Sequence, residues 1–253
     1  MKIAGATCSG FLLYMDVIHK IPILTTVFSA VFFFQLRRHW LNKGRPVYLF
    51  WWTTGVLCYG LGTLMESIVG IWGWNEPVFK AWYILGALLG GFPLAQGSVY
   101  LFIRPEKATR LMLVIAVLIV IASVAVVLSP VDYSLVEATR LTGKVLVWKG
   151  IRWITPVINL YAFVFLVGGA AYSAYRYAQE KYPAVRMWGN ICIAVGGLLP
   201  GIGGSFTKFG HTEVLYVTEL AGILFIYAGY RLMQRDGAGS LFRAQQPIVQ
   251  ARK

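Results

Sequence analysis

Charged residues and cysteines are both scarce in this sequence. Only 13% of its 253 residues are Asp, Glu, Lys or Arg, whereas soluble domains carry about 25%, and 58% are hydrophobic. Water cannot be the main solvent of such a chain. The composition therefore indicates an integral membrane protein, with the lipid bilayer as its partner. The three cysteines, Cys8, Cys58 and Cys192, contain no Cys-x-x-Cys pair and exclude a disulfide framework.

Acidic residues and histidines are also few. The chain has 10 Asp and Glu against 23 Lys and Arg, and three His. The basic residues lie in short segments between apolar runs, so they indicate topology and not a nucleic-acid partner. No phosphate loop, Ser-His-Asp set or metal-ligand spacing is present. We therefore assign no catalytic residue and no metal site, and the sequence identifies no cofactor.

Seven apolar runs are long enough to cross a hydrocarbon core of about 30 Å. They predict an all-α, polytopic membrane protein with seven transmembrane helices in residues 21–234, preceded by an outer segment, 1–20, and followed by a basic cytoplasmic tail, 235–253. The runs lie near Ile21 to Leu36, Val47 to Val69, Phe79 to Ile103, Leu111 to Leu128, Ile154 to Tyr175, Met187 to Phe206, and Val214 to Leu232.

Charge alternates between the connections. Fifteen of the 23 Lys and Arg residues fall in the first, third and fifth connections and in the tail. The positive-inside rule places these segments in the cytoplasm. Seven spans then predict a multi-pass protein of the cell membrane with its amino terminus outside and its carboxyl terminus inside.

Similar residues recur at a nearly constant offset. Pro46 and Trp51 match Pro183 and Trp188 at an offset of 137, and the third and seventh spans align at 136. This spacing predicts that the first three spans repeat as the last three in the same orientation. Such parallel repeats occur in membrane transporters. The fourth span, almost pure Leu, Val, Ile and Ala, is then a linker that faces lipid.

The three-one-three plan resembles that of the SWEET sugar transporters and is similar to the seven-helix plan of the microbial rhodopsins. The resemblance covers architecture only. The Pro-Gln pair of SWEET-type helices is absent, and the seventh span has no Lys for a retinal Schiff base. Separately, Pro93 and Pro200 predict kinks in the third and sixth spans.

Two carboxylates lie inside the spans, Glu66 in the second and Glu219 in the seventh. Charge in a hydrocarbon core is costly, so both should face the bundle interior and find partners, for which Lys80, Lys149, Arg152 and Lys208 are candidates. Helical spacing puts polar residues on the same inward faces. The predicted ligand-binding residues are Glu66, Glu219, Tyr59, Tyr216, Asn159, Gln96 and Trp82.

The same polar faces also suit helix packing, for which Gly86-x-x-x-Gly90 and Gly197-x-x-x-Gly201 are candidate motifs. Three functions remain open. The favoured hypothesis is a transporter of a small solute, coupled to protons through the two acids. The second is a receptor-like module that senses a small or amphipathic ligand and signals through a cytoplasmic partner or a second copy of itself. The third, least favoured because no catalytic set is visible, is an enzyme acting on lipid or isoprenoid.

Overall fold

The structure, a computed structural model, describes residues 18, 20–137, 140–179 and 184–235. Nearly all of the expected outer segment, 1–20, and of the expected tail, 235–253, lies outside the described residues. Within them the chain has no β-strand, and two isolated bridges in the loop at residues 129–150 are its only pairing of that kind. The predicted all-α class is therefore confirmed.

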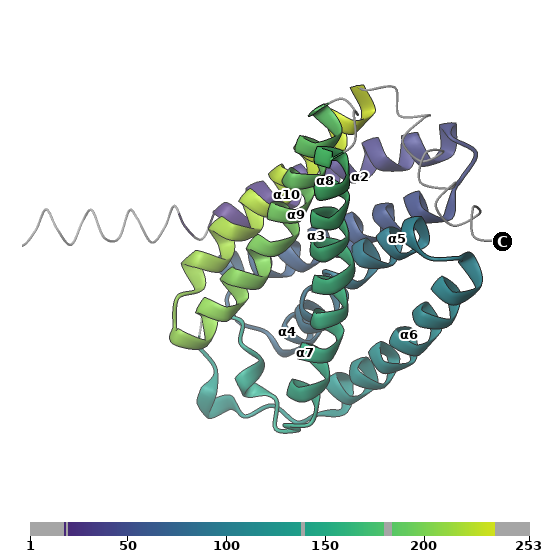
Figure 1. Cartoon of the computed structure of the whole chain (residues 1–253). Helices are drawn as coiled ribbons and strands as arrows, with labels where there is room; N and C mark the ends of the chain where they lie inside the picture. Colours follow the sequence, from purple (N-terminus) through teal and green to yellow (C-terminus); the bar gives the residue numbers. More distant parts are fainter. Residues whose placement is uncertain (1–17, 19, 138–139, 180–183, 236–253) are drawn as a thin grey trace, which may run out of the picture.

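Seven helical segments of the described chain are long and apolar enough to cross a membrane, which makes it a multi-pass membrane protein (Figure 1). Two of them, the third and the fifth, are built from two α-helices joined by a π-helical stretch. The helices are α2 (Ile21–Asn42), α3 (Val47–Trp72), α4 (Glu76–Trp82), α5 (Phe92–Phe102), α6 (Pro105–Leu128), α7 (Ile151–Ala162), α8 (Gly169–Gln179), α9 (Ala184–Phe206) and α10 (Thr212–Arg235), with π-helical η1 (Tyr83–Leu88) and η4 (Phe163–Gly168).

Proline and glycine set many of the helix ends. The helices α2, α4, α5 and α6 each carry a proline in the first two positions, where its missing N–H has no intrahelical partner to lose. At the other end of α3, Gly73 adopts a φ of +84°, which a residue with a Cβ rarely does. Prolines thus mark the starts of four helices, and a glycine marks the end of α3.

The third span is interrupted near its middle. It changes from α4 to η1, leaves helical geometry at residues 89–91, and restarts as α5 with Pro93 in the first turn. The predicted kink at Pro93 is confirmed, because the missing N–H and the ring clash do not permit a regular helix before it. By contrast, α9 runs through Pro200 without a break, so no opening occurs there.

Six of the spans form a ring. Around it, α2 packs on α3, α3 on α5, α5 on η4, η4 and α8 on α9, α9 on α10, and α10 on α2. The third and fifth spans also touch through α5 and α7. These contacts leave α6 outside the ring, packed on α7 and η1 (Figure 1).

The composition of α6 explains its outer position. Its window is the least buried of the seven, and its buried residues, Ala108, Ile115, Ile119, Ala122 and Val126, form one stripe at helical spacing. Beyond its charged first turns, most of its other residues are Leu, Val and Ile that are exposed. This agrees with the expected lipid-facing position of this span, whereas its role as a linker depends on the repeat. The internal repeat itself stays a prediction.

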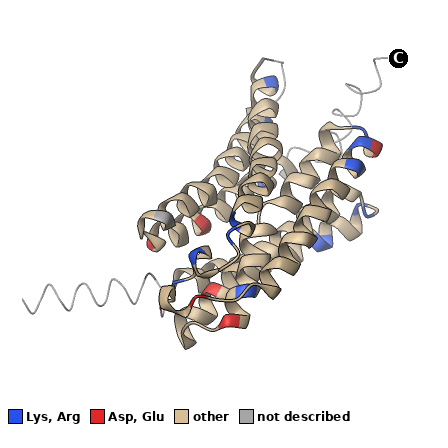
Figure 2. Cartoon of the chain, turned by 90° about the horizontal axis from the view of Figure 1, so that it is seen from below, with Lys and Arg blue, Asp and Glu red and all other residues tan. Residues whose placement is uncertain are grey.

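The two ends of the ring differ in their connections. We call the end with the α2–α3, α5–α6 and α8–α9 connections the basic side, and the opposite end the capped side. On the capped side, the loop at residues 129–150 folds back on the helices: Leu141, Val145 and Leu146 are buried, and Arg140 donates a hydrogen bond to Thr212 of α10 (2.7 Å). In Figure 2 the coloured charged residues gather at helix ends and loops, whereas the shafts are mostly tan.

Candidate functional site: a carboxyl pair inside the helix ring

The predicted polar stripe of α3 faces the ring interior. Gly55, Tyr59, Gly62, Thr63 and Glu66 are all buried, and only 3% of the surface of Glu66 is exposed. In α10, the face turned away from its predicted polar face carries Val217, Leu224 and Phe225. All three are exposed, as expected for a surface in contact with lipid. Helical periodicity therefore predicted the inward faces of both helices correctly.

Glycine brings α3 and the third span close together beside Glu66. A Cβ on Gly62 would lie 3.0 Å from the Cα of Gly86, so position 62 has no room for a larger residue without a shift, whereas a Cβ on Gly86 would make only ordinary contacts. Trp82 lies one turn before Gly86 on that span. Its indole Nε1 donates a hydrogen bond of 2.8 Å to Oε1 of Glu66.

The two acids meet across the ring. The carboxyl groups of Glu66 and Glu219 lie close enough to interact electrostatically. Two negative carboxylates at such close range repel each other, so the pair favours holding a proton on one of them. Neither Glu66 Oε2 nor Glu219 Oε2 accepts a hydrogen bond from any N–H or O–H group of the described residues.

Two tyrosines complete the surroundings of this pair. The hydroxyl of Tyr59 donates a 2.7 Å hydrogen bond to the backbone carbonyl of Glu219, and so ties α3 to α10 at the depth of the acids. Tyr216 is buried one turn before Glu219, close enough to interact electrostatically with both acids. The structure therefore brings together five predicted site residues, Glu66, Glu219, Tyr59, Tyr216 and Trp82.

The other two predicted site residues lie elsewhere. Gln96 is fully buried, but it donates to the carbonyl of Ala108 (3.1 Å) and accepts from the hydroxyl of Tyr161 (2.6 Å), so it links α5 to α6 and α7. Asn159 is exposed on α7. Its neighbours Val157 and Leu160 are exposed as well, because α7 lies at the periphery of the ring.

The partners of the acids differ from the cations considered from the sequence. Lys80 forms an ion pair with Glu76 on its own helix (2.8 Å) and donates to the carbonyl of Val127 (2.9 Å). Glu66 instead interacts with Glu219 and Trp82. The expected pairing of Lys80 with an intramembrane acid is therefore wrong, because Glu76 at the helix start is the nearer carboxylate.

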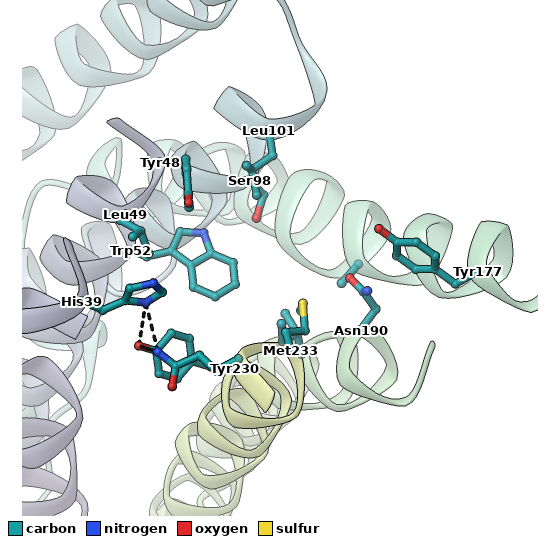
Figure 3. Close-up of a pocket in the computed structure, with 13 residues that line it drawn as sticks. His39, Tyr48, Leu49, Trp52, Ser98, Leu101, Tyr177, Asn190, Tyr230 and Met233 are labelled. Atoms are coloured by element: carbon teal, nitrogen blue, oxygen red, sulfur yellow. Dashed lines mark hydrogen bonds between the residues drawn. The ribbon is translucent and has the colours of Figure 1, made fainter. Parts of the chain in front are cut away.

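A second polar region lies at the basic side of the ring (Figure 3). There a cavity of about 50 Å³ is lined by residues of α2, α3, α5, α8, α9 and α10. At its edge, the Tyr230 hydroxyl lies 2.9 Å from Nδ1 of His39 and accepts a hydrogen bond from Nε2 of Gln234 (2.6 Å). Sequence reasoning missed this cavity, although Tyr230 continues the predicted polar face of α10.

Apolar residues separate the two polar regions. Along α3, Val56 lies between the cavity and Glu66, and along α10, Ile223 and Ile226 lie between Glu219 and Tyr230. All three are buried almost completely. The 11 residues from Glu219 to Tyr230 correspond to about 16 Å along a helix. The ring thus holds a pair of acids and a cavity at different depths with a hydrophobic layer between them.

No protein-family model, curated protein or solved structure matches this chain. The chemistry of the described residues is consequently the basis for assigning a function. That chemistry comprises a neighbouring pair of acids and a separate small cavity. Among the described residues, no group of three or more His, Cys, Asp or Glu could hold a metal ion.

Proposed function

We propose that this chain is a small-solute transporter in which the Glu66–Glu219 pair carries the coupling proton. The observation that supports this most is the meeting of two acids, Glu66 buried and Glu219 half-buried, inside a ring of helices, with a cavity at another depth of the same ring. Transporters with alternating access need a site that opens to one side at a time. The buried layer of Val56, Ile223 and Ile226 would be the barrier on the basic side.

Proton coupling follows from the chemistry of the pair. One proton shared by two carboxyl groups leaves a single negative charge, whereas loss of that proton would leave two like charges side by side away from water. The pair therefore favours taking up a proton or a cation whenever the first proton leaves. Trp82 and the two tyrosines would hold the acids in a fixed geometry during this exchange.

The interrupted third span offers a hinge for such a transporter. It leaves helical geometry at residues 89–91, between Trp82 near the acids and Ser98 at the cavity. Broken and π-helical segments occur often at functional sites in helical membrane proteins. Rotation about this break would move the two polar regions relative to each other. We further propose that the basic side faces the cytoplasm.

The test uses the full chain in liposomes that contain a pH-sensitive dye. Sugars, amino acids, amines and carboxylates are added in turn, with and without an imposed pH gradient. We expect at least one class to move protons together with solute, and Glu219→Gln or Glu66→Gln to abolish this movement because the glutamine amide cannot exchange a proton. Infrared difference spectra across a pH titration would follow the carboxyl band of the pair without any solute.

The matched control is Glu213→Gln on α10, the helix that also carries Glu219. The Glu213 carboxyl group is exposed and lies 2.9 Å from Nδ1 of His211. This variant should leave coupled movement intact. Normal coupling in both Glu66→Gln and Glu219→Gln would remove the acids from the mechanism. A folded protein that shows the carboxyl titration but moves none of the solutes would contradict transport and favour the sensing role.

A further inference from the structure

One cation of the capped side is tied to the helix that carries Glu219. Arg140, in the loop that covers this side, donates from Nε to Oγ1 of Thr212 (2.7 Å) and from Nη1 to Oε2 of Glu137 (2.7 Å). Leu141, the next residue of the loop, is buried against the helices. These contacts hold the guanidinium in place at the first residue of α10.

Thr212 lies on the face of α10 that leads to the acid pair. Tyr216 and Glu219 follow it by four and seven residues, a spacing that puts all three on one side of the helix. Thr212 and Tyr216 are both buried, with 7% and 4% of their surfaces exposed. Tyr216 interacts electrostatically with Arg140 as well as with both acids. One buried face of α10 therefore connects the guanidinium with the pair.

The start of a helix is an unusual place for a cation. The N-terminal end of a helix carries a partial positive charge, which favours anions and disfavours cations. Arg140 contacts the first residue of α10, so its charge adds to that of the helix end. This placement does not stabilise the helix itself. It does stabilise negative charge further along the same face, where Glu219 lies.

Other charged residues at this end of α10 have different surroundings. Glu213, directly after Thr212, interacts with Arg140, and its carboxyl group lies 2.9 Å from Nδ1 of His211. Lys208 belongs to the short η5 turn (Thr207–Phe209) that precedes α10. Glu213 is offset by one residue from the buried face, so it is less directly aligned with the acid pair than Arg140 is.

The elements packed on α3 and α10 contribute few further charges at this depth. In the third span, Glu76 and Lys80 pair with each other (2.8 Å). Tyr59 of α3 donates its hydroxyl proton to the backbone carbonyl of Glu219. Residues 21–36 of α2 and 187–206 of α9 contain no Asp, Glu, Lys, Arg or His. Arg140 is therefore the cation through which the capped side acts on the pair.

We propose that Arg140 is a positioning residue for the acid pair: its charge, fixed at the capped-side end of α10, stabilises the negative charge left when a proton departs from Glu66 and Glu219, and so sets the proton affinity of the pair. This inference rests on the proposed role of the pair as the carrier of the coupling proton. The guanidinium itself stays charged and passes no proton. Glu137 offsets part of its charge.

The expected effect follows from the separation along the helix. The seven residues from Thr212 to Glu219 correspond to about 10 Å. Two unit charges about that far apart, at an effective dielectric constant of about 20, change a proton affinity roughly tenfold. Removal of the Arg140 charge should therefore strengthen proton binding by about fivefold to tenfold.

The test is a pH titration of the full chain in liposomes without any solute. Infrared difference spectra follow the part of the carboxyl band that Glu219→Gln removes. In Arg140→Gln this band should persist to a higher pH than in the unmodified chain. Arg140→Lys keeps the charge and should restore a midpoint near that of the unmodified chain. Lys149→Gln, which removes an exposed cation of the same loop, should leave the midpoint unchanged.

Glu137→Gln gives the sharpest comparison, because it breaks the same ion pair from the other side. It removes a counter-charge of Arg140, so the acid pair should release its proton at a lower pH. The shift should be about twofold to threefold, since the Glu137 carboxyl group is exposed and screened by water. If the ion pair only holds the loop in place, both variants would shift the midpoint in the same direction or not at all. Either result would overturn the proposal.

Proton-coupled uptake by the same liposomes separates this inference from the proposed transport. Unshifted midpoints together with coupled uptake would overturn the role of Arg140 and leave transport standing. Opposite shifts in Arg140→Gln and Glu137→Gln, in a chain that moves no solute, would support the role of Arg140 and contradict transport.

Discussion

At the scale of single residues, the indole of Trp82 holds one oxygen of Glu66 in place. Its N–H donates at 2.8 Å, while Glu66 is almost fully buried. A donor to a buried carboxyl group offsets part of the cost of removing that group from water. Trp82 therefore contributes both to the stability of the ring and to the orientation of the acid pair.

Trp82→Phe should lower the free energy of unfolding by about 1 kcal/mol, the usual worth of a hydrogen bond between transmembrane helices. Denaturation of the purified chain in mixed detergent measures the change. Trp74→Phe is the control, because the Trp74 N–H has no acceptor among the described residues and its ring stacks on Phe79 in a way that phenylalanine preserves. Equal losses in the two variants would mean that the indole ring, and not its N–H, stabilises the protein.

Sequence reasoning reached most of this site but not all of it. Helical spacing placed Glu66 and Glu219 on inward faces because a charge avoids hydrocarbon whatever the fold. It could not predict that the Gln96 side chain would form hydrogen bonds with Ala108 and Tyr161, or that Asn159 would be exposed. Those outcomes depend on which helix lies beside each face, and a single helix pattern does not contain that information.

At the scale of elements, glycines at a spacing of seven residues join α9 to α10. Gly189, Gly196 and Gly203 of α9 face α10, where Gly222 and Gly229 face back. A Cβ on Gly196 would lie 2.6 Å from the carbonyl oxygen of Gly222, and one on Gly229 would lie 2.5 Å from that of Gly189. Small residues let the two backbones approach, and dispersion between them then replaces contacts with lipid.

Gly196→Ala should destabilise the protein by about 1–3 kcal/mol, since the added methyl group meets backbone that cannot turn away. Gly201→Ala is its control on the same helix: nothing lies within 4 Å of that position, so the change should be neutral or stabilise by about 0.5–1 kcal/mol through helix propensity. Unfolding of both variants in mixed detergent gives the difference. A stable Gly196→Ala would show that α9 and α10 can move apart freely.

The same glycines show where motif reading fails. Gly197-x-x-x-Gly201 was a candidate packing motif, but Gly201 faces open space and Gly197 faces Leu166 and Val167 of the fifth span. The packing prediction is therefore wrong for Gly201. The face of α9 that meets α10 lies one residue earlier, on Gly196. The π-helical stretches η1 and η4 were likewise beyond prediction, because they change the residue spacing locally without a marker such as proline.

At the scale of the whole molecule, hydrophobicity predicted the number of spans and left their ends open. All seven apolar runs became helices, but α2 continues past Leu36 through Arg37 and Arg38 to Asn42. Backbone hydrogen bonds persist beyond the hydrocarbon layer, so a helix does not end where its apolar run ends. The ring of six spans with α6 outside also depends on contacts between distant segments, although the apolar composition of α6 gave its lipid-facing role.

The orientation of this ring in the membrane rests on the basic residues of its connections, and it has a direct test. In a variant without native cysteines, a single cysteine replaces either Arg104 on the basic side or Lys149 on the capped side, both of which are exposed. Intact cells that express each variant are treated with a membrane-impermeant maleimide before and after permeabilisation. Moving a cluster of Lys and Arg across the bilayer is unfavourable, so the basic side should remain in the cytoplasm. We therefore expect Lys149→Cys to react in intact cells and Arg104→Cys to react only after permeabilisation. The reverse pattern would place the acid pair nearer the cytoplasm and the cavity nearer the outside, and would invert the direction in which a proton gradient drives the proposed transport.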